Sequence, residues 1–106
     1  MTKDDLRRLA LVLPGAEEKS HFDKADFRVR NKIFASLKDD ATGVIKLLPE
    51  QQAMMVEAEP RVFQSLAGSW GRKGWTKIIL AQADEITLKS ALQTAWRNVA
   101  PKTLKI

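Results

Sequence analysis

The chain has no cysteine and no tyrosine, and its 106 residues include a single histidine. Without cysteine, disulfide scaffolds, thiol nucleophiles and thiolate-bound zinc or iron–sulfur centres are excluded. One histidine, His21, also excludes an HExxH metal motif and any site built from two imidazoles. The lack of cysteine is typical of proteins in a reducing compartment, so we expect the cytoplasm.

Long apolar runs are also missing. No stretch approaches the roughly 20 apolar residues that a membrane-spanning helix needs. Lys3, Asp4 and Asp5 stand where a signal peptide has its apolar segment. A chain of this length can bury one core without metals or disulfides, so we expect a single domain, residues 1–106, with no membrane partner.

Catalytic and metal-binding patterns find little support. Adjacent carboxylates occur at Glu17–Glu18 and Asp39–Asp40, but neighbouring side chains on a strand point to opposite faces. The glycine-rich segment 68–75 lacks the GxxxxGK[ST] spacing of a phosphate-binding loop and leads into a predicted strand. The sequence thus predicts a protein that is not an enzyme, with no cofactor and no metal. A small-ligand or enzyme site around His21 and Glu17 is a remaining alternative.

Positive charge is what the chain has in excess. The net charge is +5, and residues 27–38 and 60–83 together hold eight of the eighteen basic residues and none of the thirteen acidic ones. A segregated basic surface attracts polyanions by raising their local concentration and releasing their counterions. The alternative interpretation is a solvated face that only keeps the protein in solution.

Start and stop signals divide the chain into short elements. Thr2 and Asp5 resemble a capping box before apolar residues at helical spacing, and Pro14 ends that segment. The following alternating segments are separated by turns too short for parallel crossovers. The pattern predicts helices over 3–13, from Pro49 to Pro60 with a possible restart over 62–66, and from Asp84 to Pro101, and strands over 17–22, 27–30, 32–37, 43–48 and 76–80, with Trp70 beginning a hairpin partner of the last strand.

These elements predict a two-layer α+β domain in which helices cover one face of an antiparallel sheet. Trp75 and Trp96 are expected in the core, and Trp70 is left for the core or for stacking on a ligand. Strict alternation separates two sets of side chains on the middle strands. The core-facing set is Ile33, Ala35, Leu37, Ile45 and Leu47, and the open-facing set is Lys32, Phe34, Ser36, Lys38, Val44 and Lys46. The open-facing set is either a binding surface or an edge where lysines prevent strand-to-strand aggregation.

Several motifs resemble those of the MmcQ/YjbR family across nearly the whole chain. The phenylalanine, lysine and Phe-Ala pattern within 27–35 is the most specific of them. The chain departs from the family pattern at Asn31, where glycine is common, and at Ala25, where proline is common. The matching motifs are Leu13–Glu18, His21-Phe22, Asp26–Val29, Lys32–Ala35, the segment around Trp75, Ala95-Trp96 and Ala100–Lys102.

The resemblance implies a small bacterial α+β domain of order α-β(3)-α-β(2)-α, similar in shape to type III secretion chaperones. It also implies DNA binding through a double wing, in which the second wing is the turn at 68–75. Contacts are expected to be with phosphates, of low sequence specificity, and made by a monomer or weak dimer. The expected contact residues are Arg28, Arg30 and Lys32 on one wing and Arg72, Lys73 and Lys77 on the other.

A protein partner is the alternative to nucleic acid. Phe34 and Val44 are both expected on the open sheet face, where they predict an apolar patch flanked by charge. Such a patch is typical of a protein-interaction or chaperone-like module.

Overall fold

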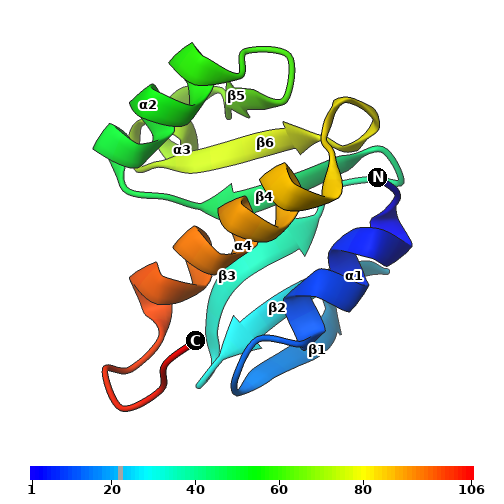
Figure 1. The fold of residues 1–106 in the computed structure, drawn as a ribbon, viewed down its shortest axis with the longest axis vertical. Coiled ribbons are helices and arrows are strands. Elements are labelled where there is room, and N and C mark those ends of the chain that lie inside the picture. Colours follow the sequence, from blue (N-terminus) through cyan, green and yellow to red (C-terminus); the bar gives the residue numbers. More distant parts are fainter. Residues whose placement is uncertain (22) are drawn as a thin grey trace.

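Figure 1 shows the computed structural model, a six-stranded sheet with helices packed against it. The structure describes residues 1–21 and 23–106, and of His21 only the backbone. Neighbouring strands are antiparallel throughout the order β1-β2-β3-β4-β6-β5. The elements are α1 (Lys3–Leu11), β1 (Ala16–His21), β2 (Lys24–Val29), β3 (Lys32–Leu37), β4 (Thr42–Lys46), α2 (Pro49–Ala58), β5 (Phe63–Ser65), α3 (Gly68–Arg72), β6 (Trp75–Ile79), the 3-10 turn η1 (Leu80–Gln82) and α4 (Glu85–Val99).

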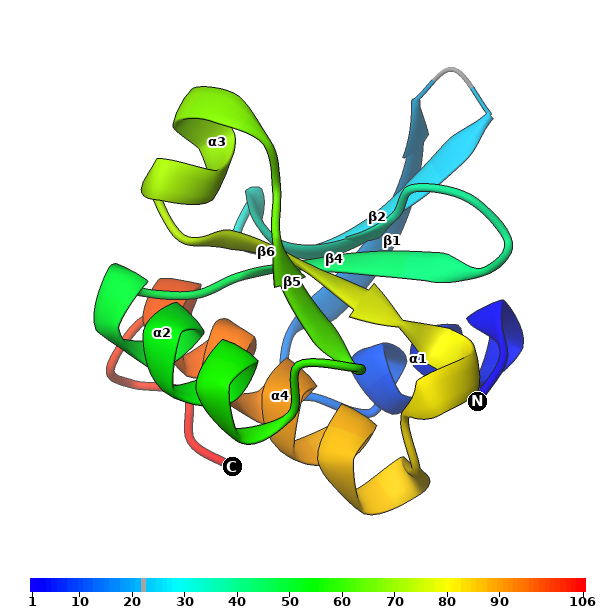
Figure 2. The same ribbon diagram turned by 90° about the horizontal axis from the view of Figure 1, so that it is seen from above.

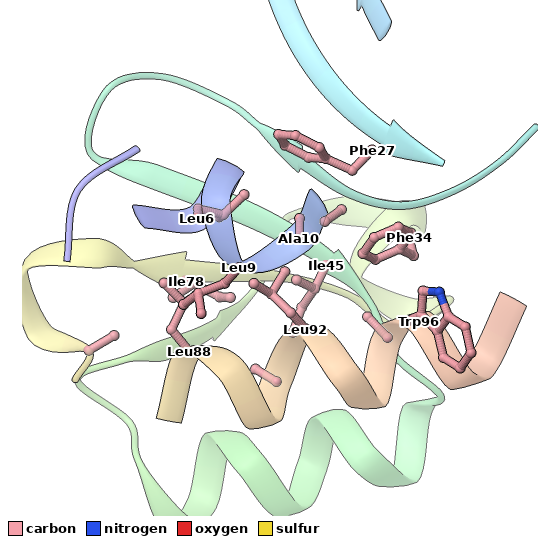
Figure 3. Close-up of a cluster of buried hydrophobic side chains, with 14 of the residues drawn as sticks. Leu6, Leu9, Ala10, Phe27, Phe34, Ile45, Ile78, Leu88, Leu92 and Trp96 are labelled. Carbon is pink, nitrogen blue, oxygen red and sulfur yellow. The ribbon is translucent and has the colours of Figure 1, made fainter. Parts of the chain in front are cut away.

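The two faces of the sheet differ in what covers them. Helices α1, α2 and α4 lie on one side, while the short helix α3 lies on the other (Figure 2). Between the sheet and helices α1 and α4 is the core, where Leu6, Phe34 and Leu92 are fully or almost fully buried (Figure 3). Trp96 is confirmed as a core residue, and its indole nitrogen donates to the carbonyl of Pro14 at 2.9 Å. The predicted two-layer α+β class is confirmed, and α3 alone departs from helices on one face.

Helix starts follow from local hydrogen bonds that the sequence signals predicted. In α1 the Thr2 hydroxyl accepts from the backbone of Asp5, whose carboxylate accepts from the backbone of Thr2 in return. In α4 the Asp84 carboxylate accepts from the backbone N–H of Thr87 at 2.7 Å. These backbone donors hold the pKa of Asp5 and of Asp84 below the usual value of an aspartate.

Helix α2 has no fully buried residue, and it is attached by the partly buried Met55 and Val56, which pack against the core, and by polar contacts. The side-chain amide of Gln52 donates to the carbonyl of Trp75 and to the hydroxyl of Thr76, each at 3.1 Å. The amide of Asn98, from α4, donates to Gln51 at 2.8 Å. These bonds fix the start of β6, where the chain places Trp75.

A β-bulge corrects the predicted alternation in β3. The register between β2 and β3 shifts at Phe27/Arg28, so that Phe27 lies opposite Ala35 while Arg28 lies opposite Ile33. Phe34 is the extra residue of the bulge, and a bulge re-aims the side chains around it. Phe34 and Ala35 are therefore both fully buried in the core, whereas Ile33 is only half-buried and faces the open side. The expectations for Ile33 in the core and Phe34 on the open face were wrong.

Three other expectations change with the structure. Four strands precede α2, as the alternating segments predicted, whereas the order implied by the family resemblance has three. Residues 63–65 form the edge strand β5, which pairs with β6, in place of the predicted short helix. Trp70 lies in helix α3 and begins no strand.

The turn between β2 and β3 has two central residues, Arg30 and Asn31, with φ of 48° and 69°. Positive φ at both positions is typical of the type I′ hairpin turn, whose twist matches that of the strands. Asn31 tolerates this conformation, whereas arginine is strained in it. The hairpin predicted here is confirmed.

Candidate binding groove on the open face

The open face of the sheet carries a groove of about 600 Å³. Helix α3 rises beside one side of the sheet and the β1–β2 hairpin rises beside the other (Figure 2), and residues from both line the groove. Its lining is mostly apolar, with lysines at its margins. The residues that line it include Lys24, Asp26, Ile33, Leu37, Lys38, Val44, Leu66, Trp70 and Trp75.

Cross-strand pairing sets the floor of the groove. Ser36 lies opposite Val44 on β4, and Val44 lies opposite Lys77 on β6. Directly opposed residues of antiparallel strands point to the same face, so this row runs across the open side of the sheet. Lys46 and Trp75 form a second opposed pair on the same face. The open-facing assignment of Val44 and Lys46 is confirmed by this register.

Two tryptophans form one wall. Trp70 on α3 is 60% exposed, and its ring meets that of Trp75 edge-on, with centroids 6.1 Å apart and planes at 73°. The ammonium of Lys73 lies 5.6 Å from the Trp70 ring centroid, and that of Lys46 lies 5.1 Å from the Trp75 centroid. The ammonium of Lys46 also donates to the backbone carbonyl of Lys73 at 3.0 Å, so the side chain of Lys46 lies next to the backbone of Lys73. Trp75 is half-buried on the open face, so its expected place in the core was wrong.

Helix α3 stands where the sequence predicted a flexible turn. Gly71 is buried, and a Cβ there would collide with the backbone carbonyl of Leu66. Gly74 has φ of 104°, and a Cβ there would collide with the carbonyl of Leu47. These glycines let α3 and the start of β6 pack closely against neighbouring backbone, so the wall of the groove is a packed helix and no mobile wing.

Six cations lie on α3, on the strands around the groove, or directly after these elements. Within residues 1–21 and 23–106, none of the six takes part in an ion pair. Five of the six ion pairs in the described part of the chain instead involve Lys3, Arg7 or Arg8, all on α1. The unpaired set is Lys24, Lys38, Lys46, Arg72, Lys73 and Lys77.

Arg28 is the exception on the open face. Its guanidinium donates twice to the Asp26 carboxylate, at 2.7 and 3.0 Å, and once to Asn31 at 3.1 Å. The hydrogen bonds from Asp26 raise the pKa of Arg28 above its usual value. Asp26 is only 7% exposed, so the pair is partly withdrawn from water. The charge of Arg28 is therefore neutralised within the protein.

The structure brings together only part of the predicted contact set. Arg72, Lys73 and Lys77 lie on α3 and β6, beside the tryptophans. Arg30 and Lys32 are exposed at the β2–β3 turn and do not line the groove. Arg28 lies closer to the sheet centre, but its charge is paired with Asp26.

Sequence reasoning missed one contributor and left three others undecided. Lys24 was not singled out, because only the tertiary fold places the β1–β2 hairpin beside the groove. Lys38 and Lys46 are left by the sequence between a binding surface and an edge that prevents aggregation, and Trp70 is left between the core and a ligand. The signal that pointed to the open face was the alternation of Val44 and Lys46 with the core-facing Ile45 and Leu47.

The predicted alternative site at His21 and Glu17 receives little support. Glu17 is exposed on β1 opposite Arg28, and the side chain of His21 falls outside what the structure describes. Among the described residues, no three histidine or carboxylate side chains come close enough to hold a metal ion. No helix in the described part of the chain has the length and apolar character to cross a bilayer.

Comparison with known proteins identifies the family. The YjbR family model matches residues 11–98. The chain belongs to the YjbR family. A crystal structure of the Deinococcus radiodurans protein DR2400, with a DUF419 domain, is similar with a TM-score of 0.77 and 23% identity, over 98% of this chain and 82% of that chain. At this identity the similarity shows the YjbR-family fold alone. No curated protein matches the chain significantly.

Proposed function

We propose that this YjbR-family chain is a non-catalytic nucleic-acid-binding protein that uses the open face of its sheet. The observation that carries the proposal is the segregation of charge between the two sides of the sheet. Six cations that form no ion pair lie on and around the open face, while five of the six ion pairs in the described part of the chain involve α1. A concave surface lined by one sign of charge concentrates a polyanion near it.

The charged groups are suited to phosphate contacts. Five of the six are lysines, which bind phosphate as compact point charges. Among the described residues that line the groove the one carboxylate is Asp26, which is paired with Arg28. Arg30 and Lys32 extend the positive surface toward the β2–β3 turn. The resemblance to MmcQ/YjbR proteins, which implies DNA binding, supports the same proposal from a separate direction.

Salt dependence is the quantitative consequence. Six phosphate contacts give a slope of roughly −4 to −5 in a plot of log binding constant against log salt concentration. The affinity therefore falls by about a thousandfold between 50 and 200 mM salt. Such a slope distinguishes contact with a polyanion from burial of apolar surface.

The test is fluorescence anisotropy with labelled oligonucleotides at several salt concentrations. Lys77→Gln removes one open-face charge and is expected to reduce the salt slope by about one. Lys89→Gln is the matched control, because Lys89 is exposed on α4 on the other side of the sheet. Absence of binding at micromolar protein and low salt, or equal effects of the two variants, contradicts the proposal.

A protein partner is a second candidate, and the apolar lining of the groove favours it. Val44 lines the groove as expected, while Phe34 is replaced there by Ile33. An acidic peptide with apolar side chains would match both the lysines and the floor. Binding of such a peptide, with no binding of nucleic acid, would favour this candidate.

A further inference from the structure

We propose that the groove takes an unpaired nucleic-acid strand, with a base stacked on Trp70 and the adjoining phosphates on the lysines beside it. This inference rests on the proposed function, and it names which form of nucleic acid the open face selects. It concerns the chemistry that single-stranded DNA and RNA share: flat bases joined by phosphates.

The apolar floor is the first argument. A duplex presents phosphates and sugars outward and keeps the faces of its bases stacked inside. Duplex phosphates can reach lysines around the groove, but they leave Ile33, Val44 and the two indoles against polar surface. An unpaired base exposes its flat faces, which can cover these side chains. The lining thus matches an unpaired strand better than a duplex.

The placement of Trp70 is the second argument. A tryptophan that is 60% exposed inside a groove leaves a large ring surface open for stacking. The edge-on contact with Trp75, at 6.1 Å between centroids, holds the Trp70 ring in place before a ligand arrives. Each base stacked on an aromatic side chain raises affinity by about 5- to 150-fold, regardless of sequence.

The ammonium groups beside the indoles are the third argument. Lys73 lies 5.6 Å from the centroid of Trp70, and Lys46 lies 5.1 Å from that of Trp75. The hydrogen bond from Lys46 to the carbonyl of Lys73 joins the two sites. A base on Trp70 therefore has cations within reach of the phosphates on either side of it. Alternation of aromatic and basic groups is the usual design of single-strand binding surfaces.

The experiment compares labelled dT12, U12 and a 12-base-pair DNA duplex by fluorescence anisotropy at 50 mM salt. Both single strands are expected to bind at least fivefold more tightly than the duplex, and a preference between dT12 and U12 tells DNA from RNA. Trp70→Leu keeps an apolar side chain but removes the ring, and is expected to weaken single-strand binding at least fivefold while leaving duplex binding within twofold. Trp70→Phe is expected to restore most of the loss.

Controls separate a binding effect from a folding effect. Because Trp70 is exposed, circular dichroism and the thermal midpoint are expected to be unchanged in both variants. Lys89→Gln is expected to leave all three affinities within twofold.

Three results overturn the inference, and they differ in what they leave standing. Equal binding of duplex and single strands with no effect of Trp70→Leu overturns the inference and leaves the proposed function. Failure of every oligonucleotide to bind overturns both. Binding of a labelled peptide of alternating glutamate and leucine, unaffected by Trp70→Leu, with no oligonucleotide binding, assigns the groove to a protein partner.

Discussion

The two faces of the sheet have charged and apolar groups arranged in opposite ways. On the covered face, Arg7 reaches Glu18 on β1 and Arg8 reaches Glu85 on α4, so charges tie α1 to its neighbours. On the open face, six cations form no ion pair in the described part of the chain, only Arg28 is paired with a carboxylate, and Trp70 is exposed. The stability of the fold is increased by pairing charges and by burying aromatic rings. The open face keeps features that stability does not require, and such features are typical of a binding surface.

The largest expected effect separates two adjacent residues of β3. Phe34→Ala empties a fully buried site on the covered face, and we expect the free energy of unfolding to fall by about 3–5 kcal/mol. Ile33→Ala changes a half-buried side chain on the groove floor, and we expect a loss of about 1 kcal/mol. Urea titration measures both values. Equal losses of stability would contradict the placement of Phe34 in the core and Ile33 on the groove floor, and so would contradict the bulge as the cause of that difference.

The same two residues show how far the sequence predicts the fold. Capping at Thr2 and Asp84, the spacing of the apolar residues of α4 and the short turns were enough to predict the two-layer class. Alternation could not reveal that Phe34 is an extra residue, because a bulge depends on the partner strand.

The groove was harder to predict because its wall is non-local. A segment with glycines at 68, 71 and 74 has low helix propensity, so the sequence predicted a turn. The backbone of α3 at Gly71 packs against Leu66, and the following Gly74 packs against Leu47, and neither close approach is visible in the local pattern. The contact residues on β6 were accessible from alternation, whereas Lys24 required the tertiary fold.

A substitution in α3 tests whether this helix, as a wall of the groove, is needed for binding. Gly71→Ala forces a methyl group against the carbonyl of Leu66, so we expect a loss of about 1–3 kcal/mol in stability and displacement of α3. Oligonucleotide affinity is expected to fall because Trp70 moves with the helix. Ser69→Ala, on the same helix, adds no atoms and is the control. Unchanged affinity in Gly71→Ala would show that α3 is no part of the site.

Among the described residues, the open face has one ion pair, between Arg28 and Asp26. Removing it should increase the difference in charge between the two faces. Asp26→Asn keeps the shape of the side chain but leaves Arg28 without its carboxylate, so the open face gains a positive charge. We expect lower thermal stability and oligonucleotide binding tighter by about 2- to 5-fold at low salt. Asp40→Asn makes the same change of net charge at the exposed partner of Lys3. Equal tightening by both variants would assign the effect to net charge alone.

Relief of strain at the β2–β3 turn should act on stability and hardly on binding. Arg30 has φ of 48°, a conformation that arginine adopts at a cost and asparagine tolerates. Arg30→Asn is therefore expected to stabilise the fold by about 0.5–1 kcal/mol. Because Arg30 stands at the turn, away from the lining of the groove, affinity is expected to fall no more than about twofold through the lost charge. A larger loss would place the turn within the binding surface.

The smallest effect concerns acid stability on the covered side. The backbone N–H of Thr87 lowers the pKa of Asp84 in the folded state, so the ionised carboxylate stabilises α4 above the pKa of the unfolded chain, near 3.8. That contribution is lost as the pH falls below about 4 and through the folded-state pKa. Asp84→Asn keeps a capping side chain that does not titrate, so its thermal midpoint should change little at pH 7 and fall less than that of the parent between pH 4 and pH 2.5. Acid should therefore weaken the start of α4 on the covered side, and identical pH profiles for parent and variant would refute the role of this cap.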